Sequence, residues 1–65
     1  MTIDNKKVEL EMSRLCINKG ELAQRMNISR TRLLVILNSK KLTPVAVGRL
    51  AKALGVDVTA IIEAE

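Results

Sequence analysis

The 65-residue sequence has no aromatic residue and no histidine, and it contains one cysteine and one proline. Without Phe, Tyr or Trp, the core must be built from Leu, Ile, Val, Ala and Met. This composition suits short, close-packed helices better than strands, which favour aromatic and β-branched side chains. A lone cysteine excludes an intramolecular disulfide. A small domain without disulfides or a metal cluster is expected in the cytoplasm.

The sequence also lacks the features of an enzyme or a membrane protein. Its longest apolar run, residues 33–37, is far shorter than the ~18 residues that a spanning helix needs, and no signal peptide is recognisable. There is no glycine-rich phosphate loop, and the acidic residues are scattered. We therefore expect one domain over residues 1–65, with no catalytic residue, no metal, no cofactor, no membrane partner and no evident small-molecule ligand.

Positive charge is concentrated in the middle of the chain. Between Arg14 and Lys52 there are nine basic residues and one acid, Glu21, whereas both ends are mildly acidic and the whole chain carries +4. A basic middle is typical of a surface that binds a polyanion. A solvated, lysine-rich surface is the alternative.

Start and stop signals predict an all-α fold, a compact bundle of about five short helices. Each predicted helix begins at a capping residue or at the first helical position after one. The fourth should end at Gly55, and Asn27 suits the left-handed turn after the second. The alternation in "VELEM" leaves a strand open at residues 8–12. The helices are expected over residues 4–15, 18–26, 29–37, 43–54 and 57–64.

Each of these segments also has an apolar stripe. Gly48, inside the fourth, should cost ~1 kcal/mol relative to Ala, and the close approach of another helix would explain it. In the last segment, at least one of Ile61 and Ile62 is expected in the core. The other candidates for burial are Val8, Met12, Leu15, Leu22, Ala23, Met26, Val47, Leu50, Ala51, Leu54 and Val58.

Two segments then resemble a known family. "INKGELAQRMNISRTRLLVILNSKK", followed by "LTPVAVGRLAKALGVDVTAII", is similar to the lambda-repressor-like, Cro-type (XRE family) helix-turn-helix DNA-binding domains over about residues 8–63. The resemblance implies a helix-turn-helix at about residues 19–38, with a recognition helix at about 30–37 in the major groove. It implies a sequence-specific, double-stranded-DNA-binding transcriptional regulator, a repressor rather than an activator. Such a protein would be bacterial or phage-encoded and nucleoid-associated.

At 100° per residue, the third helix divides into faces. Leu33, Ile36 and Leu37 share the core direction, whereas Thr31, Val35 and Asn38 point away from it and Leu34 lies between. The resembling family usually has polar residues where Leu34 and Val35 stand. Three explanations stay open: contact with thymine methyl groups, contact with a protein partner, or packing by a neighbouring element.

The resemblance and the helix geometry together predict the residues that contact DNA. Arg30 is the first candidate to read guanine, with a phosphate contact as its alternative role. Lys19 stands where relatives often have Gln, so its bracing role does not carry over. The predicted base contacts are Arg30, Thr31, Val35 and Leu34. The predicted phosphate contacts are Asn18, Lys19, Ser29, Arg32, Asn38, Lys40 and Lys41.

One short helix reads only a few base pairs, so a homodimer on a palindrome is expected, with half-sites about 34 Å apart. The competing function is a protein-interaction module on the same fold, such as an antitoxin-like partner protein. Cys16 is expected to be a small buried or half-buried residue. Four further cations are expected to be solvated on other faces: Arg14, Arg25, Arg49 and Lys52.

Overall fold

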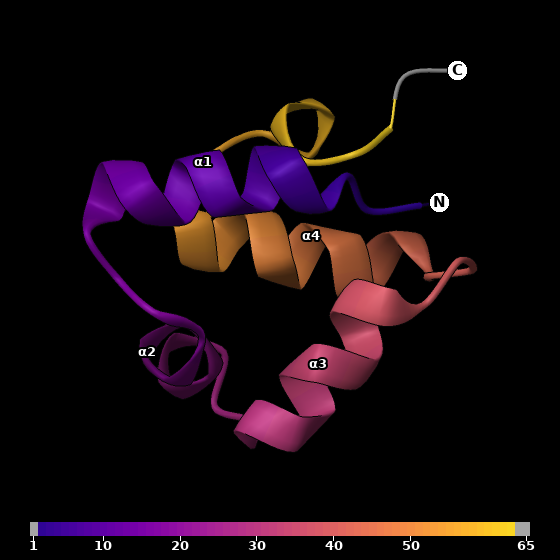
Figure 1. Ribbon diagram of the computed structural model, residues 1–65. Helices are drawn as coiled ribbons and strands as arrows, with labels where there is room; N and C mark the ends of the chain where they lie inside the picture. Colours follow the sequence, from indigo (N-terminus) through magenta and orange to yellow (C-terminus); the bar gives the residue numbers. More distant parts are fainter. Residues whose placement is uncertain (1, 64–65) are drawn as a thin grey trace.

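Helices make up most of the chain. The computed structural model describes residues 2–63, and within them there are four α-helices and one short 3-10 helix. In Figure 1, α1 and α4 lie side by side, and α2 and α3 lie on one side of that pair. The all-α prediction is confirmed. The elements are α1 (Asn5–Leu15), α2 (Lys19–Arg25), α3 (Arg30–Asn38), α4 (Pro44–Leu54) and η1 (Val58–Ala60).

The capping residues set where the helices begin, as the sequence predicts. The Asp4 carboxylate accepts from the backbone N–H groups of the first turn of α1, and Ser29 and Thr43 cap α3 and α4 in the same way. Asn18 forms a reciprocal capping box with Glu21 at the start of α2. Each cap satisfies backbone donors that a helix start leaves without a partner.

The core is aliphatic and lies between the four helices. Leu22, Leu33, Leu50 and Leu54 have no exposed surface, so each α-helix after the first contributes at least one fully buried leucine. Ile61 is also fully buried and Ile62 is half-buried, which confirms the expectation that at least one of them belongs to the core. The remaining buried residues are Ile3, Val8, Met12, Ala23, Leu37, Val47 and Ala51.

Some predicted core positions are only partly covered. Ile36 is half-buried, and the core side of α3 is formed by Leu33 and Leu37. Leu15, Met26 and Val58 are also half-buried and pack against the core.

The fifth predicted helix is one 3-10 turn. Asp57 caps it as predicted, but regular structure ends at Ala60. The chain then becomes extended, and Ile62 forms an antiparallel bridge with Ile3. Asp4 N–H donates to the Ile61 carbonyl at 2.9 Å. β-Branched residues at most positions from 58 to 62 disfavour a helix, because their side chains crowd the preceding turn. The predicted end at Ala64 lies outside the described residues.

Three further predictions differ from the structure. Cys16 is exposed because it follows α1 in the left-handed conformation, with φ at 56°. No side chain or backbone atom lies within 4 Å of a Cβ built on Gly48, so close approach of a helix does not explain this glycine. Residues 8–12 are helical, which removes the strand alternative.

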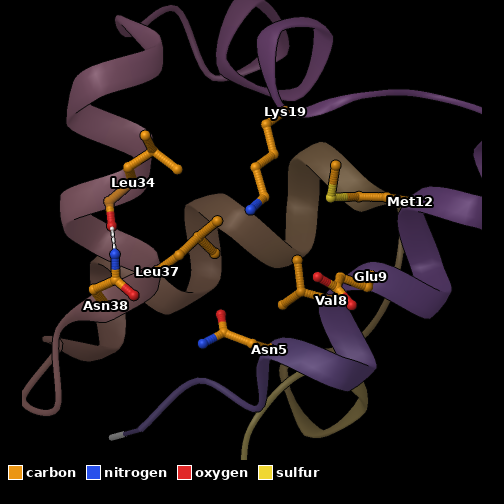
Figure 2. A pocket seen from close by; sticks show the side chains of 8 residues that line it. All are labelled: Asn5, Val8, Glu9, Met12, Lys19, Leu34, Leu37 and Asn38. Carbon is orange, nitrogen blue, oxygen red and sulfur yellow. Dashed lines mark hydrogen bonds between the residues drawn. The ribbon is translucent and has the colours of Figure 1, made fainter.

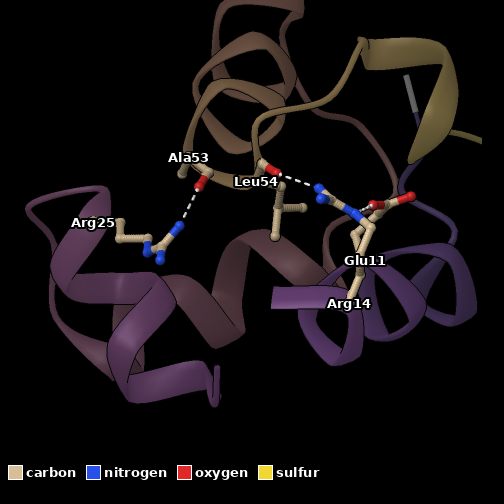
Figure 3. Close-up of polar contacts among 5 residues, drawn as sticks. All are labelled: Glu11, Arg14, Arg25, Ala53 and Leu54. Atoms are coloured by element: carbon tan, nitrogen blue, oxygen red, sulfur yellow. Dashed lines mark hydrogen bonds and ion pairs between the residues drawn. The ribbon is translucent and has the colours of Figure 1, made fainter. Parts of the chain in front are cut away.

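Arg14 and Arg25, predicted to be solvated, contact the C-terminal end of α4 (Figure 3). Arg14 Nη2 donates to the Leu54 carbonyl at 3.0 Å, and its Nε pairs with Glu11 at 2.7 Å. Arg25 Nη1 donates to the Ala53 carbonyl at 3.4 Å. These carbonyls have no helical donor and lie at the negative end of the helix dipole, where cations are favourable. The two arginines therefore connect α1 and α2 to α4.

Candidate nucleic-acid interface

The α2–α3 unit is held by a tight turn over residues 26–29. Asn27 adopts the left-handed conformation, with φ at 58°, and Ile28 N–H donates to the Ala23 carbonyl at 3.0 Å. Ala23 is buried at the small-residue position of α2, so the two helices can pack closely. In Figure 1, α2 is seen nearly end-on while α3 runs across the view, which shows that the helices cross steeply.

The outer surface of α3 is a ridge of three exposed residues, as its periodicity predicts. Thr31, Val35 and Asn38 are exposed, opposite the buried Leu33 and Leu37. The Val35 side chain is 57% exposed although it is apolar. The ridge contains no acidic residue, so nothing on it would repel a phosphate backbone.

Leu34 lies on the flank of α3 that faces α1, where it is half-buried (Figure 2). It lines a pocket of about 170 Å³ together with Val8 and Met12 of α1 and with Leu37. Packing by a neighbouring element therefore accounts for Leu34. It does not account for Val35, for which contact with thymine or with a protein partner stays open.

Arg30 and Arg32 lie on opposite flanks of the start of α3. Arg30 lines a hollow with Asn18 and Lys19 on the α1 side. Arg32 faces the other way, toward α4, beside Lys41. Both guanidinium groups are exposed, and neither has a hydrogen bond or ion pair with any residue from 2 to 63. The start of α3 thus presents two unpaired cations, one on each side of its exposed ridge.

Three polar residues predicted to contact phosphate already make local hydrogen bonds. The Ser29 hydroxyl oxygen accepts from Arg32 N–H at 3.1 Å, and Asn18 Oδ1 accepts from Glu21 N–H at 2.8 Å. Ser29 keeps its hydroxyl proton and Asn18 its amide N–H groups as donors. Asn38 Nδ2 donates to the Leu34 carbonyl at 2.9 Å, so its amide bonds back to its own helix.

The three candidate lysines occupy two places. Lys19 is half-buried, and its ammonium extends toward the pocket between α1 and α3 (Figure 2). Lys40 and Lys41 are exposed in the connection between α3 and α4. Thr2 Oγ1 donates to the Lys40 carbonyl at 3.0 Å and so connects this loop to the N-terminal segment. Sequence reasoning missed this contact because no local pattern links residues so far apart.

The described residues hold no constellation typical of other kinds of site. No group of three or more Cys, Asp or Glu side chains among them could hold a metal ion. No helix in the described part of the chain has the length and apolarity needed to cross a membrane.

Comparison of the chain with protein-family models, with curated proteins and with solved structures found no match. Function is therefore inferred from the geometry and charge of the chain itself.

Proposed function

We propose that this chain is a sequence-specific DNA-binding transcriptional regulator with the lambda-repressor-like, Cro-type fold. Helices α2 and α3 would form the helix-turn-helix, and α3 would enter the major groove of double-stranded DNA. Repression is the favoured outcome, because a domain of this size can act by occupying an operator. No catalytic step is part of the proposal.

The observation that carries this proposal is the exposed start of α3. Two unpaired arginines flank a ridge without acids, at a helix N-terminus whose dipole also favours phosphate. Arg30 is assigned to guanine and Thr31 to an adjacent base edge. Val35 is assigned to a thymine methyl group, which would bury an apolar side chain that is now exposed. Leu34 is assigned only a peripheral base contact because it is half-buried.

Phosphate contacts would set the position of α3 on the duplex. The N–H donors of Asn18 and the Ser29 hydroxyl are available on the α2–α3 side. Arg32, Lys40 and Lys41 supply unpaired charge toward α4. Lys19 would reach a phosphate only by swinging out of its pocket, and Asn38 would have to share its amide with the Leu34 carbonyl. If about six groups pair with phosphates, log affinity should fall with log salt with a slope of about −5.

Selection from a random-sequence duplex pool, at about 50 and 200 mM salt, tests the proposal. A palindromic motif with half-sites about 34 Å apart and a steep salt slope is the expected result, and it would also establish the homodimer. Binding without enrichment of any motif would contradict sequence specificity. No binding at either salt would contradict DNA binding.

The exposure of Val35 favours one second candidate, a protein-interaction module that acts as an antitoxin-like partner on the same fold. Joint substitution of Arg30 and Arg32 with Ala separates the two. A DNA regulator would lose operator binding, whereas a module that docks through Val35 would keep its partner.

A further inference from the structure

A second surface lies on the flank of the molecule where α3 meets α4 and the end of α2. It begins as a hollow of about 360 Å³, to which Arg32 and Ile36 contribute from α3 and Val45 from α4. A neighbouring hollow of about 550 Å³ shares Met26 and Arg49 with it. We call the two together the lateral groove. Its apolar lining is Met26, Ile28, Ile36, Leu42, Val45 and Ala46.

The rim of the lateral groove carries charge of only one sign. Its cations are all exposed, and no acidic residue lines either hollow. Only Arg25 among them has a protein partner, the Ala53 carbonyl; the other four make no side-chain hydrogen bond or ion pair within residues 2–63. By contrast, Glu9 lies beside Lys19 on the α1 side of α3. The cations of the rim are Arg25, Arg32, Lys41, Arg49 and Lys52.

An apolar floor inside a cationic rim fits a peptide better than a nucleic acid. A phosphate backbone offers charge and acceptors but little apolar surface, so DNA would leave the floor unburied. Val45 alone is 65% exposed. An amphipathic helix with apolar anchors at i, i+3 or i+4 and acidic residues beside them would cover the floor and pair with the rim.

We propose that the lateral groove binds an acidic amphipathic segment of a partner protein. The occupant is defined by charge complementarity: unpaired cations around apolar side chains require acids around apolar anchors. This surface lies on the opposite flank of α3 from Arg30 and Leu34. The partner could therefore bind while the exposed ridge of α3 is occupied. The proposal does not depend on the DNA-binding role, and it is measured without DNA.

The test is selection of peptides from a displayed library of random sequences against the full-length chain. Enrichment of Asp and Glu around Leu, Ile, Met or Phe at helical spacing is the expected result. An enriched peptide should bind the double variant Val45→Ser, Arg49→Gln roughly tenfold more weakly than the unsubstituted chain. Both substituted side chains are exposed, so the variant should stay folded, which circular dichroism checks.

Glu9→Gln with Leu10→Ser provides a matched control, because both residues are exposed on α1 and neither lines the groove. This control variant should bind the enriched peptide as the unsubstituted chain does. Enrichment of basic or neutral peptides, or binding insensitive to the groove variant, would overturn the proposal. So would protection of Val45 and Arg49 by duplex DNA in an NMR titration, since the groove would then be a nucleic-acid surface. Self-association abolished by the groove variant would likewise assign the groove to a second copy of the chain.

Discussion

Arg30 and Lys41 are both exposed cations near α3, but they are expected to contribute differently to DNA binding. Arg30→Ala should weaken binding to the selected operator by about 1–3 kcal/mol and relax the preference at one base pair, because a bidentate guanine contact is lost. Lys41→Ala should weaken binding to all sequences similarly and reduce the magnitude of the salt slope by about one.

Fluorescence anisotropy with operator and random duplexes, over a series of salt concentrations, measures both effects. Lys52→Ala is the matched control: it removes one exposed positive charge near the end of α4, far along the chain from α3. It should change affinity less than either variant. Equal losses on operator and random DNA for Arg30→Ala would assign Arg30 to phosphate and contradict base reading.

Val35 is a residue whose exposure separates binding from stability. Val35→Ser should change the free energy of unfolding by no more than about 0.5 kcal/mol, since the side chain is 57% exposed. The same substitution should reduce the preference for thymine at one operator position. Urea denaturation and competition between operators carrying T or C report the two quantities. Leu33→Ala, on the buried side of the same helix, should cost about 2–5 kcal/mol and shows the contrast.

Within α4, Gly48 is a helical position with free space around it. Gly48→Ala should raise the free energy of unfolding by about 0.5–1 kcal/mol, because a Cβ there meets no atom within 4 Å and alanine favours the helix. Gly55→Ala tests the opposite case. Its φ of 71° is left-handed, so a Cβ there should cost about 1 kcal/mol. Urea denaturation of both variants measures the two signs, and destabilisation by Gly48→Ala would contradict the free space.

The α-helices could be predicted from sequence because their boundaries are encoded locally. Asp4, Asn18, Ser29 and Thr43 each hydrogen-bond the turn that follows them, so a window of a few residues contains the signal. The outward direction of Thr31 and the other ridge residues follows equally from periodicity. The placement of Arg30 and Arg32 on the two flanks of α3 followed from the same rotation.

The features that sequence reasoning missed all depend on contacts between distant residues. The bridge between Ile3 and Ile62 draws the last segment out of a helix, and nothing near Ile62 in the sequence announces it. Arg14 and Arg25 looked like solvated charges because the carbonyls that they contact come from α4. The lateral groove, too, is assembled from three helices and could not be recognised in any one of them.

At the scale of the whole molecule, unpaired positive charge is the dominant electrostatic feature. The chain carries +4, and Arg14–Glu11 is the one ion pair within residues 2–63. The cations between residues 14 and 52 therefore repel one another with little compensation. Added KCl screens this repulsion, so the free energy of unfolding should rise by roughly 0.2–1 kcal/mol between about 10 and 200 mM salt.

The same salt should act on DNA binding with the opposite sign, because those cations would release fewer counterions on contact with phosphate. Thermal denaturation and anisotropy measured in one KCl series therefore give two curves of opposite slope. Glu21→Gln sharpens the test: it removes the one acid between Arg14 and Lys52 and should make stability depend more steeply on salt. A melting temperature that falls as KCl is added would mean that attractive pairs outweigh the repulsion, and the charge of this chain would then favour folding rather than binding.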